Sequence, residues 1–483
     1  MAKGEERHPP RRRRRSWLPD LGVLLVVALA FAAVQYNLGG RLFGWDPVDP
    51  ATNPAAVQPP QGLRLQPQAQ AAPVADAAAG GSAVAAKVAK AVAPYVTDPE
   101  LGRHVDVLVA RLSDGKVVYR HGAGDTMPAS TMKLLTTTAA LQSIGPMARF
   151  TTTVGRIPDT RQIVLVGGGD PFLMSSPAKA KGLYPARADI VTLARRAAAS
   201  LKQQGLTRVR LGYDNSLFSG PATNPTWPSS YADVVPPISA LWVDEGHNPD
   251  GAGFLKDPAA QAAQDFRLAL IASGIQVPLP AVARTEPAGA MPLAKMESAP
   301  LGEIIQQTLD VSDNTAAEVI GHHVGLTEGY PGSFAGGVRA VRRVLGTLGI
   351  DTTADRMYDG SGLSRRDRLD PQTLIDVLLH AASSDHPELR DVITGLPVAG
   401  FTGSLQYRFD EGAAAGRGRV RAKTGTLTGV NGLAGVATDL DGDGLVFVAI
   451  ADRVSEPDTT LARDALDKLA AALGACHCGA SIP

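Results

Sequence analysis

Strand-like and helical patterns stand at both ends of the folded part of this 483-residue chain. Near its start, residues 105–120 hold two β-rich runs around a Ser-Asp-Gly turn, and a helix is expected from about Ser130. Near its end, residues 432–451 repeat the hairpin pattern, and an amphipathic helix is expected over 459–473. The two ends therefore predict one α/β body that both of them build, with other sequence inserted between them.

Composition and patterning divide the chain further. Residues 151–290 contain their own alternating strand patterns, a Gly-rich turn and a helix near 188–204, which predicts an inserted domain. The linker proposed before the folded part is rich in Pro, Gln, Ala and Gly. The expected division is a basic tail with an apolar segment (1–36), the linker (37–81), a catalytic body in two pieces (82–150 and 291–475), the inserted domain (151–290) and a tail (476–483).

The first 36 residues indicate a destination outside the cytoplasm. Seven Lys and Arg side chains precede residues 21–34, a run of fourteen residues without charge. A basic stretch before an apolar run is typical of an export signal or a signal anchor. The run is short for a membrane span, and Ala28-Leu-Ala30 offers a cleavage pattern. A cleaved signal, a retained anchor and a buried helix all stay open. We expect a retained membrane anchor.

The charge balance and the two cysteines bound the class of protein. Lys plus Arg and Asp plus Glu both number 47, which gives no support to nucleic-acid binding. Cys476 and Cys478 cannot build a disulfide framework for so long a chain, so its stability requires a large core. With His477 they suggest a metal, but no further cysteine completes a site, and a solvated tail is favoured.

The first motif with chemical meaning is Ser130-Thr-Met-Lys133. Residues three apart lie on one helix face, so the lysine amine would lie near the serine hydroxyl. A serine hydroxyl becomes a good nucleophile when a nearby base takes its proton, and a lysine with a depressed pKa can be that base. The same spacing recurs at Ser176-Pro-Ala-Lys179, where Gly182 and Pro185 follow closely, so that copy is expected to be a loop.

Two further motifs occur once each in the chain. Ser312-Asp313-Asn314 lies between two expected helices, where its residue types favour a helix N-cap and could also point into a cleft. Lys423-Thr424-Gly425-Thr426 precedes the C-terminal hairpin, which favours an edge strand. Such an edge can pair with an extended peptide, and Lys423 can attract its terminal carboxylate. Taken alone, the first of these motifs indicates an ordinary helix N-cap and the second an ordinary strand start.

In this order the three motifs resemble the set found in penicillin-binding proteins and class A β-lactamases. The chain resembles more specifically the penicillin-binding protein 4 type of D-alanyl-D-alanine carboxypeptidase/endopeptidase, the S13 serine peptidases, which carry a large insertion between the first two motifs. The matches span about residues 100–455. Further matching segments are Pro128 to Lys133, Gly168 to Pro171, Tyr213 to Phe218, Pro237 to Leu241, Asp359 to Arg365, Gly403 to Arg408 and Ala422 to Leu427.

The resemblance implies an α/β (α+β) fold of the penicillin-binding, serine β-lactamase-like transpeptidase type, with an antiparallel sheet flanked by helices and a large inserted domain. It implies attack by Ser130 on the bond between two D-alanines of a peptidoglycan stem peptide, with Lys133 as base and Ser312 as proton relay. Residues expected to bind the substrate are Asn314, Lys423, Thr424, Gly425, Thr426 and Arg365.

The resemblance also implies that β-lactam antibiotics acylate Ser130, and it calls for no cofactor. One departure concerns specificity. Relatives that bind a diaminopimelate side chain often have an acidic residue soon after a tryptophan, whereas Trp227 is followed by serines and then by Asp233. Specificity for the stem-peptide side chain is therefore not predicted.

Alternative functions separate on simple features. A β-lactamase on the same fold is disfavoured by the large insertion, and a non-catalytic cell-wall-binding module by the intact motifs. Asp439-x-Asp441-x-Asp443 begins like a calcium loop, but position twelve is Ile450 and strands are expected on both sides, which favours a hairpin turn. His322-His323 lacks the spacing of a zinc peptidase. No metal is expected.

Overall fold

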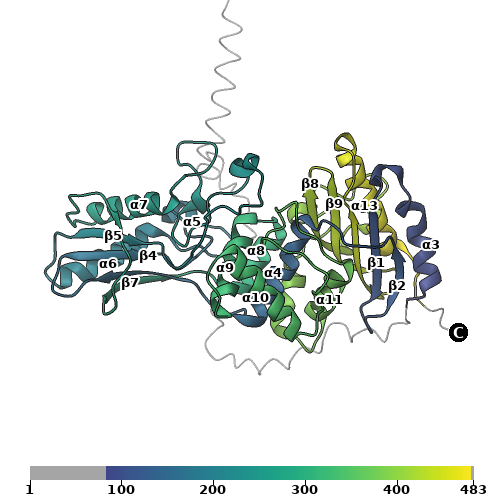
Figure 1. Ribbon diagram of the computed structural model, residues 1–483, viewed down its shortest axis with the longest axis horizontal. Helices are drawn as coiled ribbons and strands as arrows, with labels where there is room; N and C mark the ends of the chain where they lie inside the picture. The colour runs from purple at the N-terminus through teal and green to yellow at the C-terminus, as the bar shows by residue number, and fades with distance from the viewer. Residues whose placement is uncertain (1–82, 480–483) are drawn as a thin grey trace, which may run out of the picture. The chain divides into compact units, whose positions relative to one another are not determined.

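The computed structural model describes residues 83–479 (Figure 1). The expected anchor and linker, up to residue 81, lie outside the described residues. Among the helices of the described part, none combines the length and the apolar character that a membrane crossing requires.

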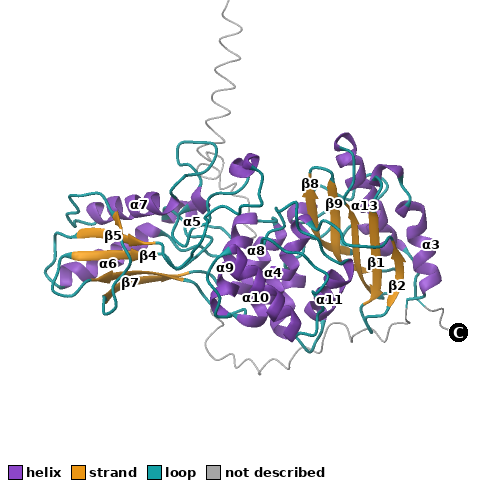
Figure 2. Cartoon of the chain, viewed as in Figure 1, coloured by secondary structure: helices purple, strands orange, loops and turns teal. Residues whose placement is uncertain are grey.

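The main sheet has five antiparallel strands in the order β2-β1-β10-β9-β8 (Figure 2). Its strands are β1 (Val105–Arg111), β2 (Val117–His121), β8 (Val420–Leu427), β9 (Val430–Thr438) and β10 (Gly444–Ala451). The N-terminal hairpin joins the C-terminal strands through β1 and β10, where Val109 is paired with Phe447. Both ends of the chain thus build one sheet, as the patterns predict.

Each face of the main sheet is covered by helices. Along β10, Val446, Val448 and Ile450 enter one apolar core, while Phe447 and Ala449 enter the other, because strand side chains alternate between faces. The second of these cores contains α3 (Ala85–Val96) and α13 (Thr459–Ala475). Helices of the first core are α4 (Lys133–Ser143), α8 (Leu301–Asp310), α9 (Asn314–Thr327), α10 (Phe334–Thr347), α11 (Pro371–Ala382) and α12 (Arg390–Thr394).

The inserted segment forms a second five-stranded sheet in the order β6-β5-β4-β3-β7. Its strands are β3 (Thr151–Arg156), β4 (Gln162–Val166), β5 (Arg210–Asp214), β6 (Val282–Ala283) and β7 (Met291–Glu297), and its longer helices are α6 (Ile190–Gln203) and α7 (Pro258–Ala272). Because β7 pairs with β3, the domain boundary expected at residue 290 falls inside this sheet and moves to about 297. Alternation alone could not assign β7, since only one of its side chains is buried.

The prediction of a loop at the second Ser-x-x-Lys copy is wrong. This segment forms the single-turn helix α5 (Pro177–Ala180). Ser176 caps it by accepting a hydrogen bond from the Lys179 amide. The Lys179 ammonium extends instead to Asp244, at 2.6 Å. This copy therefore lacks the serine–lysine contact that the motif would need for catalysis.

The expectation of a solvated tail is wrong for residues 476–479. Cys476 and Cys478 form a disulfide, and Cys478 is fully buried in the core beside α13. The Cys478 carbonyl accepts a hydrogen bond of 2.7 Å from the Val84 amide, and Asp439 accepts one from the Cys478 amide. Asp439 belongs to the β9–β10 turn, as the hairpin prediction for that segment requires.

Candidate active site

Ser130 lies in a tight 3-10 turn (Ala129–Met132), and the regular helix α4 begins directly after that turn, at Lys133. In such a turn side chains three apart are nearly eclipsed, which brings Lys133 over Ser130. The Lys133 Nζ lies 2.8 Å from the Ser130 Oγ. Ala129, just before the serine, has a φ of 45°, a left-handed conformation that is strained for a residue with a side chain. Such strain is concentrated at functional sites.

The Lys133 side chain is completely buried, and its amine has three neighbours. Besides Ser130, the Nζ donates to the Asn314 Oδ1 at 2.7 Å and to the Ser361 carbonyl at 2.9 Å. Burial lowers the pKa of Lys133 to about 8, with Glu318 and other buried acids opposing the shift. A lysine with that pKa is partly neutral near pH 7 and loses its proton as pH rises through about 8, so it can act as a base.

The second motif lies at the start of α9. Asp313 caps this helix by accepting a hydrogen bond from the Ala316 amide at 2.9 Å, so the cap prediction is confirmed. Asn314 contacts Lys133 directly. Ser312 has a φ of 63°, which places the residue just before the cap in a strained turn. Within the described part no hydrogen bond joins the Ser312 hydroxyl to Ser130 or Lys133.

Buried acidic residues that the sequence analysis did not identify hold the backbone segment that Lys133 contacts. The Glu318 carboxylate accepts hydrogen bonds from the Gly360 and Ser361 amides, at 3.0 and 2.8 Å. This fixes the Ser361 carbonyl that Lys133 binds. Burial, with Asp359 nearby, raises the pKa of Glu318 to about 8. The Asp359-Gly-Ser-Gly segment was noted for its resemblance alone, and nothing in the local pattern linked it to Glu318.

The third motif lies on β8, which is an edge strand of the main sheet, as predicted. Lys423 is fully buried, and its Nζ donates to the Thr424 carbonyl at 3.0 Å. Burial, together with repulsion from Lys133 and Arg408, lowers the pKa of Lys423 well below its usual value. The two motif lysines therefore lie within electrostatic reach of each other.

Gly425 brings β8 against the turn that carries Ser130. A Cβ at this position would stand 2.7 Å from the Pro128 carbonyl oxygen and 3.3 Å from the Thr131 methyl group. Only glycine permits this approach without movement, as the sequence suggested. Beside it, the Thr424 hydroxyl lies 3.0 Å from the Ser404 hydroxyl, a contact that no sequence pattern predicted.

Arg365 and Thr426 lie at the open end of this strand. Arg365 donates a hydrogen bond of 3.0 Å to the Thr428 carbonyl, just beyond β8, so it joins the 359–365 loop to the strand's end. Thr426 is exposed. The Ala422 amide is directed away from β9, because it donates to Pro397. Alternate amides of a strand share a direction, so the Thr426 amide also faces the open edge.

The inserted domain contributes Glu245 to this region. Glu245 and its neighbour Asp244 both have positive φ values, of 55° and 51°. Burial and the nearby charge of Asp313 raise the pKa of Glu245 to about 9, so Glu245 holds its proton at neutral pH. The positive charge of Arg187 opposes the rise in the pKa of Glu245. No sequence pattern indicated this contact, because the two residues are far apart in the chain.

The fold and the site define a penicillin-binding type of serine enzyme, and comparison with known proteins gives its family. Residues 88–250 and 252–473 match the model of the D-Ala-D-Ala carboxypeptidase 3 (S13) family. Carboxypeptidase DacB of Mycolicibacterium smegmatis is 35% identical over 487 residues, covering 98% of this chain and all of that protein. A carboxypeptidase of Mycobacterium tuberculosis is 37% identical over 419 residues, covering 84% and 87%.

The chain belongs to the S13 family, and it is a serine-type D-Ala-D-Ala carboxypeptidase. A solved structure supports the fold. Penicillin-binding protein 4 of Haemophilus influenzae superimposes with a TM-score of 0.65 at 21% identity, covering 80% of this chain and 99% of that one. The expected α/β fold of the penicillin-binding type, with an antiparallel sheet flanked by helices, is thereby confirmed.

Proposed function

We propose that the chain hydrolyses the D-Ala-D-Ala bond of peptidoglycan stem peptides through an acyl-enzyme on Ser130. The observation that carries the proposal is the 2.8 Å contact between the Ser130 hydroxyl and the buried Lys133 amine. Neutral Lys133 takes the hydroxyl proton as Ser130 Oγ attacks the carbonyl carbon. The amides of Ser130 and Thr426 stabilise the resulting oxyanion, each contributing roughly 3 kcal/mol.

The leaving D-alanine requires a proton on its amine. Ser312 relays that proton from Lys133, while Asn314 holds the peptide backbone. Lys423 and Thr424 bind the terminal carboxylate, and Gly425 allows the substrate strand to lie against β8. Arg365 forms the wall at the far end. Water then attacks the ester, with Lys133 again as base, and releases the shortened peptide and free Ser130.

The same acyl-enzyme supports endopeptidase cleavage of cross-linked peptides, since the acyl donor is identical and the leaving amine alone differs. Penicillins resemble D-Ala-D-Ala, and penicillin-binding protein 4 of H. influenzae was solved with a β-lactam. We infer that they acylate Ser130 here. The basic and apolar N-terminal segment supports a location outside the cytoplasm, with the protein attached to the membrane or released to the wall.

The test is mass spectrometry of the products from purified peptidoglycan, with a labelled-penicillin adduct mapped on the same protein. Wild-type enzyme should release D-alanine and shortened stem peptides and carry the label on Ser130. Ser130→Ala should lose both, while Ser176→Ala, at the non-catalytic copy of the spacing, should keep both. Label on another residue, or product formation by Ser130→Ala, would refute the assignment. Rapid turnover of penicillin would instead favour a β-lactamase.

A further inference from the structure

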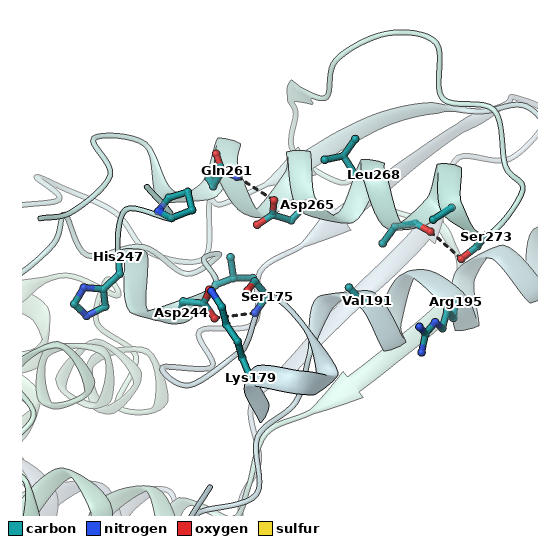
Figure 3. Close-up of a pocket in the computed structure, with 14 residues that line it drawn as sticks. Ser175, Lys179, Val191, Arg195, Asp244, His247, Gln261, Asp265, Leu268 and Ser273 are labelled. Atoms are coloured by element: carbon teal, nitrogen blue, oxygen red, sulfur yellow. Dashed lines mark hydrogen bonds and ion pairs between the residues drawn. The ribbon is translucent and has the colours of Figure 1, made fainter. Parts of the chain in front are cut away.

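A cavity of about 500 Å³ lies in the inserted domain between α5, α6 and α7 (Figure 3). None of the residues proposed for catalysis lines it. Its lining mixes charged, polar and apolar side chains: Ser175, Lys179, Val191, Arg195, Val243, Asp244, His247, Pro249, Gln261, Asp265, Leu268, Ala269, Ala272 and Ser273. Ligand cavities in proteins usually measure about 300–1,000 Å³, so this one is large enough for a small-molecule ligand.

One face of α7 is directed at this cavity. Gln261, Asp265, Leu268 and Ala272 recur at the spacing of helix turns, so they form a single stripe. Leu268 stays 51% exposed, although most leucines of the domain are buried. On α6, Val191 and Arg195 face the cavity one turn apart. Both helices thus present apolar surface and charge together, which is typical of ligand sites.

The charges around the cavity are unbalanced at one end. Asp244 accepts hydrogen bonds from the Lys179 ammonium at 2.6 Å and from the Ser175 amide at 2.9 Å. Burial acts to raise the pKa of Asp244, but these hydrogen bonds outweigh it and hold the pKa below its usual value. Asp265 accepts one hydrogen bond, of 3.0 Å, from Gln261. Burial and the charge of Asp244 raise the pKa of Asp265. Two carboxyl groups therefore share one lysine.

The opposite charge lies elsewhere in the same lining. Arg195 is exposed, and no hydrogen bond or ion pair joins its guanidinium to another residue in the described part of the chain. Figure 3 shows Arg195 on α6, with Asp265 on α7 and Asp244 beside Lys179. A ligand with a cationic and an anionic group would complement both sets of charges.

We propose that this cavity binds a zwitterionic amino acid or short peptide at a second site, separate from the catalytic residues. The ligand's ammonium group lies between Asp244 and Asp265, which relieves their repulsion. Its carboxylate binds Arg195, whose planar guanidinium suits bidentate pairing. Its apolar part lies on Leu268 and Val243. The inference does not depend on the acyl-enzyme roles proposed above, because it concerns binding alone.

The test uses hydrogen-exchange mass spectrometry on the full-length protein with a stem tetrapeptide that contains diaminopimelate. Binding should protect α6 and α7, separately from any protection around Ser130 and β8. The same peptide with its amines acetylated and its carboxyls amidated should leave α6 and α7 unprotected. Protection confined to the catalytic segments, or equal protection by the blocked peptide, would overturn the proposal.

Matched variants locate the site. Asp265→Asn and Arg195→Gln should each weaken binding at α6 and α7 by roughly tenfold, the effect of losing one charged hydrogen bond. Asp250→Asn and Arg208→Gln, which alter exposed residues outside the lining, should bind as the wild type does. Unchanged affinity in both cavity variants would also overturn the proposal. Release of D-alanine is a separate readout, so failure of the catalytic assignment would not be mistaken for failure of this site.

Discussion

The helical side and the sheet side of the active site each contain a buried lysine, and the two lysines differ in their hydrogen bonds and neighbouring charges. On the helical side, Lys133 has three hydrogen-bonding neighbours and a shell of acids that includes Glu318. On the sheet side, the Lys423 amine hydrogen-bonds within the described residues only to Thr424, and two other cations, Lys133 and Arg408, act with burial to lower its pKa. Burial lowers the pKa of both lysines, but the buried acids limit the shift at Lys133.

This difference separates two roles. Lys133 is held in place whether or not it carries a proton, which suits a base that must give and take protons. Lys423 forms no ion pair within the described residues, although the charge of Asp310 reaches it, so a carboxylate that arrives on the substrate would supply a direct partner. Substitution of Lys133 should therefore impair catalysis, whereas substitution of Lys423 should impair substrate binding.

The largest loss is expected for Lys133→Met, which keeps the side-chain volume but removes the base. Its kcat/KM for release of D-alanine should fall by about 10³-fold, within the range for general-base catalysis. Circular dichroism should stay that of the wild type. Activity within tenfold of the wild type would show that another group takes the serine proton.

A smaller loss is expected for Lys423→Gln, because it removes a charge that binds substrate and not the base. The KM for a substrate with a free terminal carboxylate should rise by roughly 10²-fold, the effect of one lost charge-assisted contact. The same substrate with an amidated terminus should bind wild type and variant nearly alike. An equal loss on both substrates would deny Lys423 its carboxylate role.

The pH dependence of acylation should report the pKa of Lys133. The amine must be neutral to act, so acylation by penicillin should increase as pH rises through about 8 and then level off. Glu318 acquires its negative charge as pH rises through about 8, and that charge raises the lysine pKa, so Glu318→Gln should move the inflection to lower pH, by about one unit. Glu328→Gln, at the C-terminal cap of the same helix, where Glu328 pairs with Arg343, is the control. An inflection that stays at its wild-type pH would exclude Glu318 as the group that tunes Lys133.

The smallest effect concerns Glu245. Its pKa of about 9 lies above that of an ordinary glutamate, so its proton is present at neutral pH and is lost as pH rises through 9. Ionisation then places two like charges against the start of α9, and kcat should decline a few-fold above that pH. Glu245→Gln should abolish the alkaline decline and change neutral activity little. A decline that persists in this variant would mean that the pair does not position the motif.

The sequence predicted the parts that depend on local patterning. Strand alternation and turn residues located both hairpins of the main sheet, and the motif order led to the correct family and fold. The roles of Ser130, Lys133 and the other site residues stay predictions that the geometry supports. Missed were contacts between distant segments, such as Glu318 with the Ser361 amide, Ser404 with Thr424 and Glu245 with Asp313. Such contacts depend on tertiary packing, which no local pattern records.

Two failures have simple physical causes. The strand β7 is mostly exposed, so its residues carry no clear alternation. The C-terminal cysteines were expected in a solvated tail because no further cysteine completes a metal site, yet backbone pairing with Val84 and the Asp439 turn holds them against the core. In both cases hydrogen bonds to distant backbone decided the outcome.

The pairing of β1 with β10 has a consequence for when activity can begin. Ser130 and Lys133 leave the ribosome long before β8, and the strands that complete the sheet lie between residues 420 and 451. A nascent chain therefore holds a nucleophile without a substrate groove, and cannot act until β8, β9 and β10 have been synthesised. The order of the motifs along the chain thus prevents hydrolysis before the sheet is complete.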